Sequence, residues 1–149
     1  MTKEHILSKL TAQCARGEHC LDDMRRKMAR WQVEPSLKEE VLQYLVSEQY
    51  IDESRYARAF IEDKIKFNGW GKHKVEQALR MKRVPPEVYT PLLAEVADDD
   101  YEAILLPLLQ SKSKTLKYDS DYELRMKLIR FAMQRGFTYE QADHCLRML

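Results

Sequence analysis

An internal repeat of apolar residues is the feature that most constrains the fold of this chain. Seven positions recur after a shift of 51 residues and again after a shift of 53. The first set is Met24, Met28, Val33, Leu37, Val41, Leu42 and Leu45. The second is Val75, Leu79, Val84, Val88, Leu92, Leu93 and Val96. The third is Leu128, Ala132, Phe137, Gln141, Cys145, Leu146 and Leu149, in which only Gln141 is strongly polar. A period of about 50 residues indicates a tandem array of small helical units, each unable to bury its apolar face alone.

Composition narrows the class of protein further. The chain has 149 residues, of which 33% are charged and 44% apolar, as in a folded globular protein. Its 4 glycines and 5 prolines are too few for an all-β chain with many tight turns. The longest apolar run, residues 103–109, is too short to span a membrane. The first residues lack the apolar stretch of a secretory signal, and the 3 cysteines are an odd number, so we expect a cytoplasmic protein with reduced thiols.

Apolar residues at helical spacing predict nine helices, and no segment alternates like a half-buried strand. The first unit holds helices over residues 3–16, 20–31 and 36–49. The second holds 52–67, 71–83 and 86–96, and the third holds 98–111, 120–135 and 138–149. The sequence therefore predicts an all-α fold of three tandem three-helix repeats, residues 1–50, 51–97 and 98–149, that form an elongated, curved array.

Capping signals place several helix boundaries. Three pairs have capping-box spacing, in which a hydroxyl and a carboxylate or amide satisfy free N–H groups reciprocally: Ser36 with Glu39, Ser120 with Glu123, and Thr138 with Gln141. Pro86 suits a first helical turn, and Gly136 suits a helix end. The segment 68–71 predicts a break between helices, and the lysine-rich segment 111–121 predicts an exposed loop.

The charge pattern indicates where the chain binds a partner. The net charge is only +1, but residues 51–86 carry nine basic and five acidic side chains, and residues 87–110 carry six acidic and no basic ones. Lysine and arginine neutralise phosphates, and exposed aromatic rings stack on unpaired bases. The candidate contact residues are Arg55, Arg58, Lys64, Lys66, Trp70, Lys72, Lys74, Arg80, Lys82 and Arg83. The alternative is a solvated face, with Phe67 and Trp70 packed between units.

Other clusters favour structural roles. The acidic run 98–100 falls where a helix begins, and the helix dipole stabilises negative charge there. Cys14, His19 and Cys20 lack the further ligands of a zinc site, and Cys145 occupies an apolar repeat position, which predicts a core residue. There is no phosphate-binding glycine loop, nucleophile elbow or zinc-protease motif. We therefore expect no enzyme activity, metal, cofactor or small-molecule substrate.

Residues 20–96 resemble a known family. The stretch Tyr50-Ile51-Asp52-Glu53-Ser54-Arg55-Tyr56-Ala57-Arg58-Ala59-Phe60 looks like the signature of RecX regulatory proteins. The resemblance continues through Gly69-x-Gly71, Val75, Leu79, Lys82 and Val84, and upstream through Asp23-Met24-x-x-Lys27-Met28. The chain departs from the family pattern at four positions. Cys20 replaces a capping serine, Glu53 replaces an aspartate, and Gln32 and Arg83 each replace a glycine that ends a helix.

The resemblance implies a function as well as a fold. RecX-like proteins are arrays of three three-helix units that bind the RecA recombinase filament and modulate it in DNA repair, recombination and the SOS response, usually by inhibition. They are not enzymes and have no fixed catalytic set. We expect a monomer whose second unit contacts either filament-bound single-stranded DNA or an acidic RecA surface. Two alternatives stay open: a stand-alone DNA-binding module built on two helices and a turn, and a general helical adaptor.

Overall fold

The computed structural model describes all 149 residues and contains nine α-helices and no strand, which confirms the predicted all-α class. The helices are α1 (Lys3–Cys14), α2 (Leu21–Arg30), α3 (Pro35–Ser47), α4 (Glu53–Lys66), α5 (Lys72–Met81), α6 (Pro86–Ala94), α7 (Asp98–Ser113), α8 (Asp121–Gln134) and α9 (Tyr139–Arg147). Each predicted helix is present, with ends that differ by only a few residues. None of them combines the length and the hydropathy that crossing a bilayer requires.

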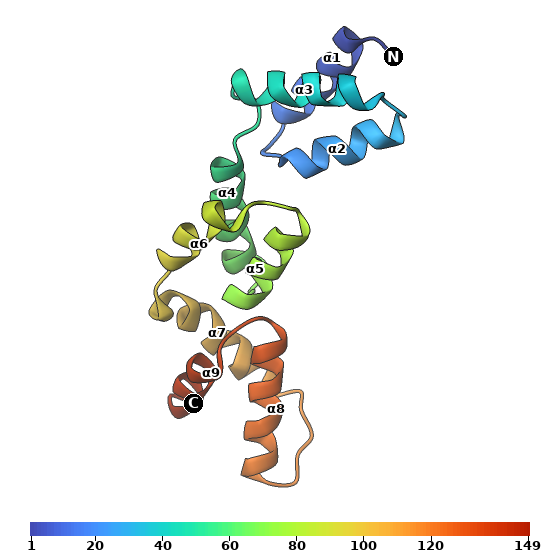
Figure 1. Cartoon of the computed structure of the whole chain (residues 1–149). Helices are drawn as coiled ribbons and strands as arrows, with labels where there is room; N and C mark the ends of the chain where they lie inside the picture. Colours follow the sequence, from blue (N-terminus) through green and yellow to red (C-terminus); the bar gives the residue numbers. More distant parts are fainter.

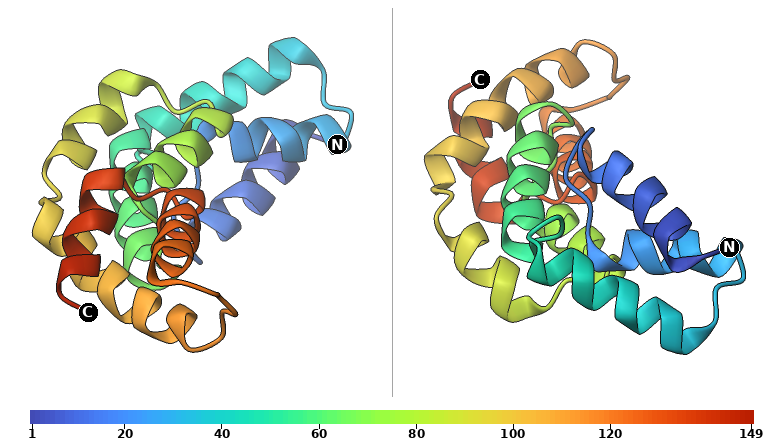
Figure 2. Two further views of the ribbon diagram at one scale, coloured as in Figure 1. Left: turned by 90° about the horizontal axis from the view of Figure 1, so that it is seen from below. Right: turned by 90° about the horizontal axis from the view of Figure 1, so that it is seen from above.

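The helices follow one another in triplets along the long axis of an elongated molecule (Figure 1). We group them as repeat 1 (α1–α3), repeat 2 (α4–α6) and repeat 3 (α7–α9). Seen along that axis, repeat 1 projects to one side of the other two, which gives the array its bend (Figure 2). The division at residues 50 and 97 stays a prediction.

Of the three predicted capping boxes, one is complete, one is formed in part and one is absent. At α9, the Thr138 hydroxyl accepts from the Gln141 N–H and the Gln141 amide oxygen accepts from the Thr138 N–H, both at 3.0 Å. At α8, the Ser120 hydroxyl accepts from the Glu123 N–H at 3.1 Å, but the Glu123 carboxylate accepts from the Asp119 N–H at 2.8 Å instead of from Ser120. The predicted box at Ser36 is wrong. Helix α3 begins one residue earlier, at Pro35, because a proline ring presets the helical φ and its missing N–H costs nothing in the first turn.

The second helix of each repeat, α2, α5 or α8, ends with the same backbone geometry. Gln32, Arg83 and Gly136, which are related by the sequence shifts of 51 and 53, have φ values of 57°, 58° and 98°. After each of them, the next N–H bonds back to a carbonyl five residues earlier, as in Val33 to Met28 at 3.0 Å and Val84 to Leu79 at 3.2 Å. This is the Schellman arrangement, which favours glycine at the left-handed residue. The predicted stop at Gly136 is confirmed. The predicted loop starts later, because α7 continues to Ser113.

Two separate apolar cores hold the molecule together. Repeat 1 has a core of nine buried residues, among them Met24, Val41 and Leu45. Repeats 2 and 3 share a core of 19, which includes Leu79, Leu105 and the predicted core residue Cys145. The polar Gln141 is also buried, and its side-chain amide donates to Asp98 Oδ1 at 3.0 Å, so the exception in the repeat is hydrogen-bonded.

The joint between repeats 1 and 2 is made by polar contacts and by two residues that each pack in the core of the neighbouring repeat. Cys20, the N-cap of α2, packs in the core of repeats 2 and 3, whereas Ile51, just before α4, packs in the core of repeat 1. Around them, the Leu21 N–H donates to Glu53 Oε1 at 3.3 Å. Lys82 Nζ lies 2.8 Å from Asp23 Oδ1. The joint is therefore largely electrostatic.

The joint between repeats 2 and 3 is made by backbone instead. The Gly71 N–H donates to the Arg135 carbonyl at 2.8 Å, and the His73 N–H donates to the Gly136 carbonyl at 3.0 Å. A Cβ atom at Gly71 would lie 2.3 Å from the Phe137 nitrogen, so only glycine allows this approach. Direct hydrogen bonds and a shared core make repeats 2 and 3 one body.

Candidate nucleic-acid interface

The predicted contact surface divides into two sets of cations. Five of its members form ion pairs with carboxylates: Arg55 with Glu18, Arg58 with Glu95 (3.1 Å), Arg80 with Glu76 (3.5 Å), Lys82 with Asp23 (2.8 Å) and Arg83 with Asp22 (4.0 Å). Three of these pairs, at Arg55, Lys82 and Arg83, connect repeat 2 to residues 18–23 of repeat 1. The set therefore includes residues that hold the array together as well as residues that face solvent.

The second set surrounds the turn between α4 and α5. Lys64, Lys66, Lys72 and Lys74 are in no ion pair. Trp70 lies between two of them, with Lys64 Nζ 5.1 Å and Lys74 Nζ 4.7 Å from its ring centroid. Cation–π contacts at these distances fix the lysines beside the aromatic ring. We call Lys64, Lys66, Trp70, Lys72 and Lys74 the basic–aromatic surface.

Trp70 packs against a core, as the alternative of aromatic residues buried between units predicts, but Phe67 does not. Trp70 is half-buried and packs against the core shared by repeats 2 and 3. Phe67 is 75% exposed, with Lys66 Nζ 5.5 Å from its ring centroid. An exposed phenylalanine beside lysines offers a stacking face, and this ring packs in no core.

Repeat 3 adds three residues that the sequence reasoning missed. Arg135 donates from Nη2 to the Asn68 carbonyl at 2.7 Å and from Nε to the Gly69 carbonyl at 3.1 Å. Its guanidinium lies 5.5 Å from the Phe131 ring, which also has Lys112 Nζ at 5.3 Å. An open groove between the α4–α5 turn and α7 is lined by Lys66, Phe67 and Arg135. Sequence alone offers no signal for Arg135, because the residues it contacts lie 66 and 67 positions away.

The acidic run 98–100 lies in the first turn of α7, where it stabilises the helix N-terminus. Asp98, Asp99 and Asp100 form its first turn, and Asp100 accepts from the Ala97 N–H at 3.3 Å. These contacts agree with the expected stabilisation of a helix N-terminus. No three His, Cys, Asp or Glu side chains converge as metal ligands would.

Burial at the joint between repeats 1 and 2 moves the pKa values of several groups. Burial raises the pKa of Cys20 to about 11 and also raises that of Glu53. At Asp23, burial acts in the same direction, but the hydrogen bond and charge of Lys82, together with hydrogen bonds from Cys20, outweigh it and lower the pKa. The Glu53 atom Oε2 is buried without a hydrogen-bond partner. The acidic side of this joint is therefore only partly neutralised.

Together, the fold and surface define an all-α tandem-repeat protein with a basic–aromatic face. Comparison with known families makes the assignment specific. Residues 52–90 match the model of the RecX second three-helix domain, and residues 98–146 match that of the RecX third three-helix domain. The chain belongs to the RecX family, as the resemblance in residues 20–96 indicated.

Individual relatives agree. The regulatory protein RecX of Vibrio parahaemolyticus is 27% identical over 132 residues, which are 89% of this chain and 83% of that protein. The regulatory protein RecX of Clostridium perfringens is 26% identical over 129 residues, 85% of this chain and 60% of that protein. A crystal structure of regulatory protein RecX superposes with a TM-score of 0.90 at 15% identity, over 97% of this chain and 73% of that one. RecX from Lactobacillus salivarius gives a TM-score of 0.83 at 15% identity, over 98% and 97%.

Proposed function

We propose that this protein binds the RecA recombinase filament and inhibits its ATPase and strand-exchange activities in DNA repair and recombination. Membership of the RecX family carries the proposal, because the resemblance implies a modulator of RecA. The elongated array supports it, since an extended surface suits a partner that is itself a long polymer. We propose that the protein acts as a monomer in the cytoplasm and without enzyme activity of its own.

The basic–aromatic surface is the proposed contact region. Its four lysines are free of ion pairs, and its tryptophan is held between two of them. This chemistry suits single-stranded DNA within the filament, because cations bind the backbone while rings stack on bases. It also suits an acidic RecA surface. The other predicted residues, Arg55, Arg58, Arg80, Lys82 and Arg83, keep free donors at their exposed ends and belong to the same proposal.

The test measures ATP hydrolysis by RecA on single-stranded DNA at stoichiometric amounts of the protein. We expect turnover to fall, and co-sedimentation to place the protein with the filament. A variant with Lys64, Lys66, Lys72 and Lys74 replaced by glutamine should lose most of the effect. Unchanged turnover with the wild-type protein would refute the proposal.

A second candidate is a stand-alone nucleic-acid-binding module, favoured by the position of Trp70 between Lys64 and Lys74. That function predicts tight DNA binding without RecA and a steep dependence of affinity on salt. A general helical adaptor instead predicts that charge reversal at Lys72, Lys74 and Arg80 leaves partner binding intact. Parallel binding titrations with DNA alone and with RecA filaments distinguish the three functions.

A further inference from the structure

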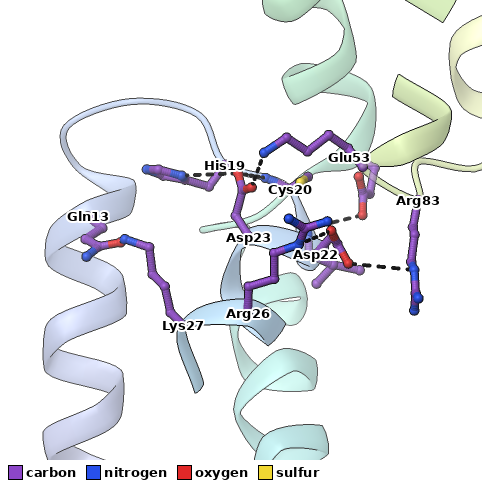
Figure 3. Close-up of polar contacts among 11 residues, drawn as sticks. Gln13, His19, Cys20, Asp22, Asp23, Arg26, Lys27, Glu53 and Arg83 are labelled. Atoms are coloured by element: carbon purple, nitrogen blue, oxygen red, sulfur yellow. Dashed lines mark hydrogen bonds and ion pairs between the residues drawn. The ribbon is translucent and has the colours of Figure 1, made fainter. Parts of the chain in front are cut away.

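Two arginines from different repeats converge on one buried carboxylate. Arg26, on α2 of repeat 1, places Nε 2.9 Å from Asp22 Oδ2. Arg83, just after α5 of repeat 2, places Nε 4.0 Å from Asp22 Oδ1 (Figure 3). The Asp22 side chain is only 6% exposed, whereas those of Arg26 and Arg83 are 64% and 77% exposed. The acid lies beneath and the two guanidinium groups face solvent.

This arrangement leaves most of the donors of both arginines free. A guanidinium has five N–H donors, and Arg26 uses one of them on Asp22. The Arg83 distance is too long for a hydrogen bond, so its donors stay available while the charge of Asp22 attracts the group. The planar fork of arginine matches the oxygens of a phosphate. A buried acid that draws two exposed forks together prepares a site for one bridging anion.

The position of this pair links it to the basic–aromatic surface. Lys72 and Arg80 are eight residues apart, which places them on one stripe along α5, and Arg83 lies in the turn that follows the helix. Helix α5 has 10 residues and spans about 15 Å. The basic–aromatic surface lies at its first end and the arginine pair at its last. A polyanion that lies along α5 would therefore meet cations at both ends.

We propose that Arg26 and Arg83 form a phosphate-binding site that bridges repeats 1 and 2 and receives the backbone of a nucleic-acid strand that lies along α5. The site extends the proposed contact region, and thus rests on the proposed function, into a repeat whose overall charge is balanced. Because one phosphate contacts both repeats, strand binding also fixes the orientation of repeat 1 against repeat 2.

The experiment measures the binding of fluorescent oligothymidylate to the full chain by anisotropy, over a series of salt concentrations. The variants are Arg26→Gln, Arg83→Gln and the double variant. Arg130→Gln, an exposed arginine on α8 with the same charge change, is the control. We expect each single variant to weaken binding roughly fivefold, the double variant to reduce the salt slope by about 0.7, and the control to do neither. If both arginines hold one phosphate, the double variant loses less than the product of the two single effects.

Two further measurements make the result decisive. Arg26→Lys and Arg83→Lys keep the charge but lose the fork, so we expect them to bind more weakly than the wild type. Circular dichroism melting identifies any variant that fails to fold. Affinities equal to that of Arg130→Gln overturn the phosphate site, and so does normal oligothymidylate binding combined with a lost effect on RecA, which would assign the pair to an acidic protein surface. If the wild type binds no oligothymidylate, this inference fails, while the ATPase measurement still decides the proposed function independently.

Discussion

At the scale of single residues, Gly71 is a position where the fold tolerates little change. Its N–H donates to the Arg135 carbonyl, and its Cα faces the backbone of Gly136 and Phe137. Both neighbours are main-chain atoms, which cannot move aside as a flexible side chain can. The second glycine of Gly69-x-Gly71 therefore has a direct physical reason in the packing of repeat 2 on repeat 3.

Gly71→Ala tests this contact. The added Cβ would lie 2.3 Å from the Phe137 nitrogen, so α5 and the 136–137 turn must separate. We expect the free energy of unfolding to fall by about 2–3 kcal/mol, the scale of overpacking a tight site. Gly17→Ala is the matched control, because no atom lies within 4 Å of the new Cβ. Equal melting temperatures for the two variants would contradict the account.

Trp70 is the residue on which the proposed stacking surface depends. Replacing Trp70 with leucine keeps apolar volume against the core but removes the ring between Lys64 and Lys74. We expect affinity for oligothymidylate to fall roughly tenfold, because stacking contributes about 1–3 kcal/mol per base. Trp70→Phe should retain most of the affinity.

Trp31→Leu is the control for that experiment, since Trp31 is also half-buried and has Lys9 Nζ 5.3 Å from its ring, but lies in repeat 1. Anisotropy titrations compare the variants. A loss of affinity in Trp31→Leu as large as in Trp70→Leu would argue against a specific surface around Trp70.

At the scale of helices, the local part of the structure was predictable and the contacts between units were not. Spacing and caps predicted the nine helices, because both act within a few residues. The basic–aromatic surface was predictable for the same reason, since its members lie within 11 positions. The pairs Arg55–Glu18 and Lys82–Asp23 join residues 37 and 59 positions apart, so no local pattern indicated that these cations have partners.

Glu53, at the start of α4, provides a pH-dependent test of the joint between repeats 1 and 2. Burial raises its pKa, so the ionised group destabilises the folded state at neutral pH, and this cost disappears as the pH falls below about 4. Glu53→Gln keeps the acceptor for Leu21 and removes the charge. We expect it to raise the free energy of unfolding at neutral pH, because no charge is then buried at this position, and to leave it unchanged at acidic pH.

Asp23→Asn is the control of opposite sign. The folded structure lowers the pKa of Asp23. The Asp23 carboxylate therefore stabilises the protein above the pKa of the unfolded state, and this stabilisation is lost as the pH falls through the pKa of the folded state. This variant should therefore be less stable than the wild type at neutral pH and converge with it in acid. Thermal melting over a pH series measures both. Parallel pH curves for the two variants would refute the assignment.

At the scale of the whole molecule, the three repeats share one pattern of apolar residues but differ in how tightly each packs against its neighbour. Repeats 2 and 3 share one core of 19 buried residues and a backbone-to-backbone joint. Repeat 1 has its own core of nine, and only Cys20 crosses from it into the larger one. A repeat with a small core and a polar joint loses less buried apolar surface when it unfolds than a repeat whose core continues into its neighbour.

We therefore expect repeat 1 to unfold at a lower free energy than the rest of the chain. Native-state hydrogen exchange should show weaker protection in α1–α3 than in α4–α9. Leu45→Ala and Leu105→Ala form the matched pair, because both side chains are fully buried, one in each core, and each truncation should cost about 2–5 kcal/mol. Leu45→Ala should raise exchange only in α1–α3, whereas Leu105→Ala should raise it throughout α4–α9. If Leu45→Ala raised exchange equally in all nine helices, the chain would unfold as one cooperative unit, and repeat 1 could not change its orientation independently of repeats 2 and 3.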